Sequence, residues 1–284
     1  MLTGCAGRTI EPAAALVPKG AEPKLDWVEW GLTLARAVVD DKVDYAKLLE
    51  DRRPLDRFLA LVSRVGPQST PDQFPTRNDR LAYAINCHNA AIVRSVLALA
   101  RGGTLPAYLP SDLETRFRFR IDGRLQTAAD LRREVESLAG DDWRVRFALT
   151  DGTMSGPPLA RNAFLGDLLD AQLNQVTQSA LQAPGVVRID HGEQGMFLWR
   201  GLYEIKDRLI REYETETQAR DASFLNVLCQ WADRHRRELL NTAVGYEVAL
   251  MPADNRPDAV EPPPPERPKG LFSAFSSITF LRPQ

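Results

Sequence analysis

The segment from Asn78 to Arg101 constrains the fold of this chain more than any other part. Two adjacent stripes of residues follow it at helical spacing, which predicts one long helix with a wide buried face. The Asn and Asp residues at its start favour a helix N-terminus, and Gly102-Gly103 favours its end. The stripes are Leu81, Ile85, His88, Ile92, Val96 and Leu99, and Ala82, Asn86, Asn89, Val93 and Leu97. We therefore expect this helix to form the centre of the protein.

Three polar residues, Asn86, His88 and Asn89, interrupt this apolar face. Burying them is costly unless each finds a hydrogen-bond partner. One alternative is structural, with the amides holding irregular backbone of the loop at 150–159. The other is a ligand pocket under that loop, with Asp151, Thr153 and Ser155 at its rim. The structural alternative is favoured because a buried irregular loop needs such donors and acceptors.

The rest of the pattern predicts a helix-rich α+β single domain in which a small sheet packs on the central buried helix. A hairpin is expected around Asp122-Gly123, and Asn162 is expected to cap a helix. Further helices are expected at 27–39, 43–49, 54–65, 126–138, 162–180, 198–213 and 223–240, and strands at 144–150, 186–189 and 246–251. The predicted domain covers 25–256, and a proline-rich spacer with an apolar C-terminal peptide follows at 257–284.

Composition excludes several classes of protein. Lys and Arg total 36 against 38 Asp and Glu, a net charge of −2, so no nucleic-acid partner is expected. No apolar run approaches the roughly 20 residues of a membrane-spanning helix. The three cysteines form no CxxC pair, so neither a metal site nor a cofactor is expected.

The N-terminal sequence Leu2-Thr3-Gly4-Cys5 resembles a bacterial lipobox, in which the Cys becomes the lipid-bearing N-terminus. Residues 1–24 are interpreted as a lipobox remnant and a flexible tether. Only four residues precede Cys5, which is too few for an export signal, so a late start codon or a trimmed chain is inferred. Lipid on Cys5 would place the protein on the extracytoplasmic side of the cell envelope. Ala6 favours the outer membrane in a Gram-negative cell.

Three stretches together resemble the bacterial and plant family called domain of unknown function 547. They are Val43-Asp44-Tyr45, the run from Leu81 to Ala90, and Phe147-Ala148-Leu149 with the Ser155-Gly156-Pro157-Pro158-Leu159 and Leu169-Asp170-Ala171-Gln172-Leu173 motifs. The resemblance implies a fold and a lipoprotein-like setting but no reaction. Where the family tends to have His and Cys, this chain has Arg146, Asp151 and Gly156, so a family His/Cys mechanism could not use those positions.

A central helix followed by a strand with polar residues also resembles the layout of papain-like and transglutaminase-like enzymes. Cys87 would be the nucleophile, with its pKa lowered by Arg80 and Arg94. His88 cannot easily be its base, because adjacent helical residues project about 100° apart. An unreactive Cys87 is favoured over a catalytic one. The weak catalytic candidates are Cys87, His88 and Asp151, and the ligand-binding candidates are Asn86, His88, Asn89, Arg146, Asp151, Ser155 and Gln172.

The leading interpretation is a lipid-anchored envelope protein whose domain binds or scaffolds an envelope protein or a small ligand without catalysis. The alternative is a cysteine/histidine-dependent hydrolase or amide/acyl transferase. Its site would lie between the 78–101 helix and the 150–159 loop.

Overall fold

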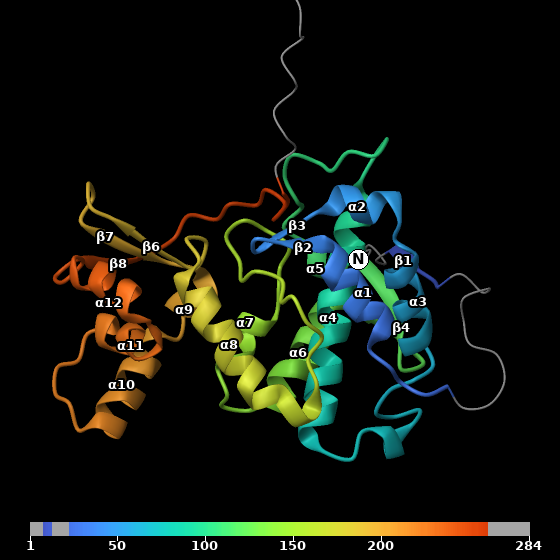
Figure 1. Ribbon diagram of the computed structural model, residues 1–284, viewed down its shortest axis with the longest axis horizontal. Helices are drawn as coiled ribbons and strands as arrows, with labels where there is room; N and C mark the ends of the chain where they lie inside the picture. Colours follow the sequence, from blue (N-terminus) through green and yellow to red (C-terminus); the bar gives the residue numbers. More distant parts are fainter. Residues whose placement is uncertain (1–7, 13–22, 261–284) are drawn as a thin grey trace, which may run out of the picture.

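The computed structural model describes residues 8–12 and 23–260. Within these ranges helices dominate and the strands are short, which confirms the expected helix-rich α+β fold. Figure 1 shows two packed parts, with helices α1 to α6 on one side and the β6–β8 sheet with α9 to α12 on the other. Helices α7 and α8 lie between them.

The elements of the first part surround one helix. They are β1 (Arg8–Ile10), α1 (Val28–Ala37), β2 (Val38–Val39), β3 (Lys42–Val43), α2 (Tyr45–Glu50), α3 (Arg53–Val62), η1 (Pro71–Gln73), α4 (Arg77–Leu99), α5 (Leu113–Arg116), β4 (Phe117–Ile121), β5 (Arg124–Thr127) and α6 (Ala128–Ala139). The second part and its connection comprise α7 (Val145–Ala148), η2 (Gly166–Leu168), α8 (Leu169–Gln182), β6 (Val187–Asp190), β7 (Gly195–Leu198), α9 (Arg200–Tyr203), α10 (Lys206–Thr217), α11 (Phe224–Trp231), α12 (Arg234–Asn241) and β8 (Glu247–Leu250).

Helix α4 is the predicted central helix, and every residue from 81 to 93 is buried. A helix buried on all sides needs other elements around its whole circumference, and Figure 1 shows it enclosed by the blue and green helices. Its N-terminus differs from the prediction. Thr76 caps the helix and forms a reciprocal capping box with Asp79, so Asn78 lies inside the first turn rather than at the cap.

Within residues 8–12 and 23–260 the strands form three separate small sheets rather than the single sheet that was predicted. Their orders are β1-β4-β5, β2-β3 and β6-β7-β8. The Asp122-Gly123 hairpin is confirmed: both residues have positive φ, and β4 pairs antiparallel with β5. The sequence pattern does not predict β1, which pairs parallel with β4 through the register of Arg8 with Phe117.

The segment 144–150 was predicted wrongly as a strand. Residues 145–148 form the short helix α7, so the papain-like layout with a base on this strand does not form. The apolar residues of this segment face two different cores. Phe147 packs in the second part, in edge-to-face contact with Trp143, while Val145 and Leu149 belong to a cluster against α4. The alternation of apolar residues in this segment therefore arises because they pack into two different cores, and not because they lie on the two faces of a strand.

Three other helix predictions had wrong boundaries. Asn162 caps nothing, because α8 begins only at Leu169 after the turn η2. The helix expected at 198–213 divides into the end of β7, α9 and α10. The helix expected at 223–240 is broken at Ala232, and Asp233 caps the second half by accepting a hydrogen bond from the Arg236 N–H at 2.7 Å.

After β8 the chain returns to the first part as an extended segment, residues 251–260, which we call the return strap (Figure 1). Its backbone bonds three other segments. The N–H of Leu109 donates to the carbonyl of Asn255 at 2.7 Å, the N–H of Met154 donates to the Arg256 carbonyl at 3.0 Å, and the N–H of Val43 donates to the Asp258 carbonyl at 2.9 Å. The strap therefore ties the two parts together.

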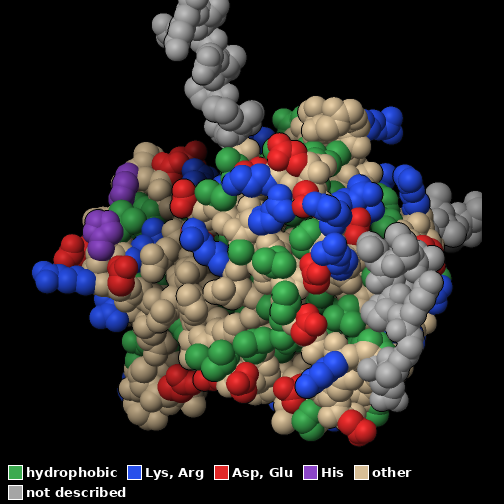
Figure 2. Space-filling view, turned by 45° about the vertical axis from the view of Figure 1, so that its right-hand side comes forward, with side chains coloured by type: hydrophobic (Ala, Val, Ile, Leu, Met, Phe, Trp, Pro, Cys, Tyr) green, Lys and Arg blue, Asp and Glu red, His purple; other side chains and the backbone are tan. Residues whose placement is uncertain are grey.

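Among the residues described, no helix is both long and apolar enough to pass through a lipid bilayer. Basic and acidic side chains are interspersed over the face seen in Figure 2. The predicted anchor residue Cys5, most of the predicted tether and the peptide at 271–281 lie outside the described residues.

Candidate functional site

Asn89 and Asn86 on α4 are occupied by backbone. The Asn89 side chain accepts from the N–H of Thr150 at 3.1 Å and donates to the carbonyl of Ala148 at 2.8 Å. Asn86 bonds both backbone groups of Phe164, at 2.8 and 3.0 Å, and accepts from the indole of Trp30 at 3.1 Å. Both amides are almost completely buried. They hold irregular chain against the helix, as the structural alternative expected, and neither lies at a cavity.

The loop after α7 lies directly on α4. Gly152 has a φ of +77°, and a side chain there would approach the Ile92 and Val96 methyl groups at 3.2 Å. Glycine is therefore needed at this position both for the left-handed backbone and for close contact with the helix. This packing fixes Asp151 at the start of the loop.

A cavity of about 250 Å³ lies between this loop and the segment before β4, and we call it the Glu114 cavity. Its wall is built from residues 109–111, 113 and 114, from Asp151, Thr153 and Ser155, from 199–200, and from three residues of the return strap, Met251, Ala253 and Asn255. Of the seven predicted ligand-binding residues, only Asp151 and Ser155 line it.

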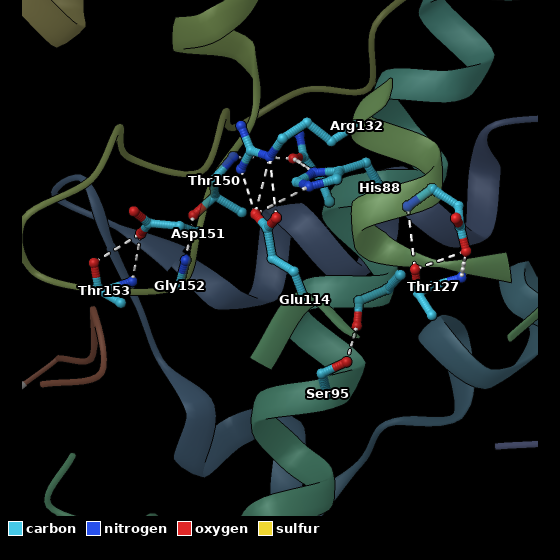
Figure 3. Close-up of polar contacts among 12 residues, drawn as sticks. His88, Ser95, Glu114, Thr127, Arg132, Thr150, Asp151, Gly152 and Thr153 are labelled. Atoms are coloured by element: carbon cyan, nitrogen blue, oxygen red, sulfur yellow. Dashed lines mark hydrogen bonds and ion pairs between the residues drawn. The ribbon is translucent and has the colours of Figure 1, made fainter. Parts of the chain in front are cut away.

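Glu114 projects from α5, is held by Arg132 and lies near His88 (Figure 3). Arg132 of α6 donates to it in a bidentate arrangement, with Nε at 3.0 Å and Nη2 at 2.5 Å from Oε1. His88 Nε2 lies 3.8 Å from the same oxygen. Although partial burial opposes ionisation, the contact with the Arg132 guanidinium lowers the pKa of the Glu114 carboxyl to about 2. Glu114 is therefore a fixed carboxylate at neutral pH.

His88 lies behind Glu114 and does not reach the cavity. Its ring is completely buried, which lowers its pKa and keeps it neutral. Nδ1 lies 3.2 Å from Asn89 Oδ1, an acceptor, so this nitrogen carries the proton when the two bond. Nε2 then has no hydrogen-bond partner and faces the Glu114 carboxylate at a distance too long for a hydrogen bond.

Asp151 supplies the second carboxyl group of the cavity. Its Oδ1 accepts from both the backbone N–H and the hydroxyl of Thr153, each at 2.8 Å (Figure 3). Burial nevertheless raises the pKa of Asp151, and the negative charge of Glu114 adds to this shift. Ser155 is tied to the return strap, since its hydroxyl accepts from the Asp254 N–H at 3.0 Å.

Cys87 has no feature of a catalytic thiol. Its expected neighbours Arg80 and Arg94 do not lower its pKa. Burial instead raises the pKa well above the usual thiol value, and Tyr83 is its hydrogen-bonding neighbour. The side chain is completely enclosed in the apolar core, so a substrate cannot reach it. The helix places it away from the lining of the Glu114 cavity.

Arg146 and Gln172 do not line the Glu114 cavity. The guanidinium of Arg146 is 3.7 Å from Glu204. Gln172 bonds the backbone of Ala163 and Leu165 at 2.8 Å each, at the edge of a separate cavity of about 200 Å³. No group of three or more His, Cys, Asp or Glu side chains in residues 8–12 and 23–260 is arranged to hold a metal ion.

Sequence reasoning missed five residues around the Glu114 cavity. They are Glu114, Arg132, Trp199, Arg200 and Asn255. Glu114 and Arg132 come from two helices separated by a hairpin, and no spacing rule pairs them. Trp199 and Arg200 lie at the start of α9, in a segment that was predicted as part of a longer helix.

Comparison with known proteins gives one match. Searches of curated proteins and of solved structures found nothing similar to this chain. Residues 71–179 match the model of a family described as "Protein of unknown function, DUF547". This range contains α4, Glu114, Arg132 and Asp151 but ends before Trp199, Arg200 and the return strap. The segment that carries the central helix and both cavity carboxyl groups is therefore similar to the DUF547 family model, which supports the resemblance noted from the sequence.

Proposed function

We propose that this protein is a non-catalytic binding module that takes a small polar ligand in the Glu114 cavity. The observation that carries the proposal is a cavity with two fixed carboxyl groups and no reactive thiol or imidazole. Glu114 and Asp151 reach the wall, whereas Cys87 and His88 are completely buried behind it. Binding sites for small molecules are typically concave, mostly apolar and supplied with a few placed polar groups.

The cysteine/histidine alternative has no support from this geometry. A nucleophile and its base must reach the substrate and each other. Cys87 is enclosed by apolar neighbours and its thiol is held protonated by burial. His88 bonds Asn89 and faces Glu114 rather than Cys87.

A cavity-blocking variant tests the binding function. Ser111 lines the Glu114 cavity and is exposed, so Ser111→Trp should fill the opening without disturbing the core. Ser137→Trp, at an exposed position of α6, is the matched control. In a fragment screen by ligand-observed NMR, we expect some fragments to bind the wild type and Ser137→Trp but not Ser111→Trp. A library in which no fragment is sensitive to Ser111→Trp would refute the proposal.

The proposed location is the cell envelope, with the domain anchored through lipid on Cys5. The support is the lipobox-like sequence Leu2-Thr3-Gly4-Cys5. The test is growth of cells carrying the full-length gene with labelled palmitate. We expect label on the protein and its loss in Cys5→Ser. An unlabelled protein, or label that survives Cys5→Ser, would remove the anchor from the proposal.

A further inference from the structure

The Glu114 cavity carries unlike charges in different parts of its wall. Glu114 and Asp151 come from the family segment, and Arg200 comes from the start of α9. Among the described residues, no hydrogen bond or ion pair engages the Arg200 side chain, which is exposed. This arginine is thus available to a ligand, and a guanidinium is well suited to a carboxylate.

Both carboxyl groups keep unused capacity to accept hydrogen bonds. Arg132 contacts Glu114 Oε2 only through Nε, at 3.2 Å, whereas Oε1 receives the shorter bonds. Asp151 uses Oδ1 for both bonds from Thr153. A side chain at Gly156 would come within 2.2 Å of Asp151 Oδ1, so this glycine lets the carboxyl lie where it does. A carboxylate oxygen can accept about two hydrogen bonds.

Two carboxyl groups meet this wall, and only one of them is paired with a cation. Arg132 bonds Glu114, whereas the hydrogen bonds that Asp151 accepts come from the neutral groups of Thr153. Burial raises the pKa of Asp151, and the negative charge of Glu114 adds to this shift. A ligand with an ammonium group would donate to these carboxylate oxygens and balance their charge.

Part of the remaining wall is apolar, and the cavity is small. Leu109, Leu113, Met251 and the ring of Trp199 contribute to it. A volume of about 250 Å³ is below the usual range of drug-sized sites, roughly 300–1,000 Å³, so the ligand has few non-hydrogen atoms. A molecule with an ammonium, a carboxylate and a short apolar group matches all three kinds of surface.

We propose that the Glu114 cavity binds a free α-amino acid with an apolar side chain, with its ammonium group at Glu114 and Asp151 and its carboxylate at Arg200. This inference rests on the proposed binding function and names the ligand class for the same cavity. The side chain of the amino acid would lie against Leu113, Met251 and Trp199.

Isothermal titration calorimetry with leucine, methionine and phenylalanine tests the ligand class. The tightest of the three is then compared with its amide, which lacks the carboxylate, and its N-acetyl derivative, which lacks the ammonium. Each loss removes a charge-assisted hydrogen bond, so we expect about 10-fold weaker binding or more for both derivatives. Equal binding of all three forms, or binding of none, would overturn the proposal.

Charge variants locate the two ends of the ligand. Arg200→Gln should weaken the amino acid about 10-fold but leave the amide unchanged, because the amide has no carboxylate to lose. Asp151→Asn should weaken the amino acid and the amide alike. Arg220→Gln, at another exposed arginine, is the control and should change neither. If Arg200→Gln and Arg220→Gln weakened the binding of the amino acid equally, the role of Arg200 would be refuted.

The fragment screen separates this inference from the proposed function. Fragments that are blocked by Ser111→Trp but unaffected by excess amino acid would leave the binding function standing and refute the ligand class. If no fragment responds to Ser111→Trp and no amino acid binds, both proposals fail.

Discussion

Two sets of polar groups lie around α4, one buried and one partly buried, and they differ in what satisfies them. The amides of Asn86 and Asn89 are hydrogen-bonded to the backbone of Phe164, Ala148 and Thr150. The carboxyl groups of Glu114 and Asp151 are held by Arg132 and Thr153, but both can accept further hydrogen bonds at a cavity. Burial of a polar side chain is therefore not in itself evidence of binding, because the backbone can use its hydrogen bonds. Under the proposed function, the binding residues differ in that they can still accept hydrogen bonds from the side of a cavity.

The largest effect is expected at Asn86, on the structural side of this comparison. Asn86→Ala removes partners from both backbone groups of Phe164 and from the Trp30 indole, all in a dry interior. We expect the free energy of unfolding to fall by about 3–5 kcal/mol in chemical denaturation. Asn78→Ala, exposed on the first turn of the same helix, should change it by less than about 0.5 kcal/mol. Similar losses of unfolding free energy in Asn86→Ala and Asn78→Ala would contradict the structural role of Asn86.

Thiol labelling should separate a core cysteine from a catalytic one. Cys87 is completely buried with a raised pKa, whereas Cys229 is partly exposed. In a Cys5→Ser background, native labelling followed by mass spectrometry should modify Cys87 at least about 100-fold more slowly than Cys229. Labelling of Cys87 that is faster than that of Cys229, with an activity-like pH profile, would restore the enzyme alternative.

Glu114 should contribute to stability in a defined pH range. Its folded pKa of about 2 is below the ordinary value, so its contribution is complete above about pH 4.5 and is lost as the pH falls toward 2. Between pH 5 and 2.5 the wild type should lose about 2 kcal/mol more unfolding free energy than Glu114→Gln. Other carboxyl groups titrate in both proteins and cancel in this difference. Parallel pH curves would show that Arg132 does not hold an ionised Glu114.

Asp258 of the return strap should show an effect of the opposite sign and similar size. Burial raises its pKa to about 6, although Lys42 lies 2.6 Å away and favours its ionised form. The folded protein therefore binds this proton more tightly than the unfolded chain, and stability from this group declines as the pH rises from about 4 to 6. Asp258→Asn should gain about 2 kcal/mol relative to the wild type from pH 4 to pH 7. If Asp258→Asn instead gained stability relative to the wild type as the pH fell, the ion pair with Lys42 would outweigh burial in setting the pKa of Asp258.

The amino-acid sequence predicts helix α4 and its buried amides far better than it predicts the carboxyl groups at the Glu114 cavity. The two stripes on α4 reflect a periodicity that packing enforces, and the Asp122-Gly123 turn follows from the positive φ that its residues tolerate. The error at 144–150 arose because Val145 and Phe147 face two cores in a four-residue helix. Glu114 and Arg132 meet only through the packing of α5 against α6, which no local pattern encodes.

The return strap has a consequence for how the cavity comes into being. Met251 and Asn255 reach Leu109 and Glu114 only after the chain has completed the whole second part, a separation of well over one hundred positions. Closing so long a loop is slow and entropically expensive, so the pocket should be among the last features to assemble during folding. Amide hydrogens of Leu109 and Met154 should accordingly gain protection from exchange later than those of α4.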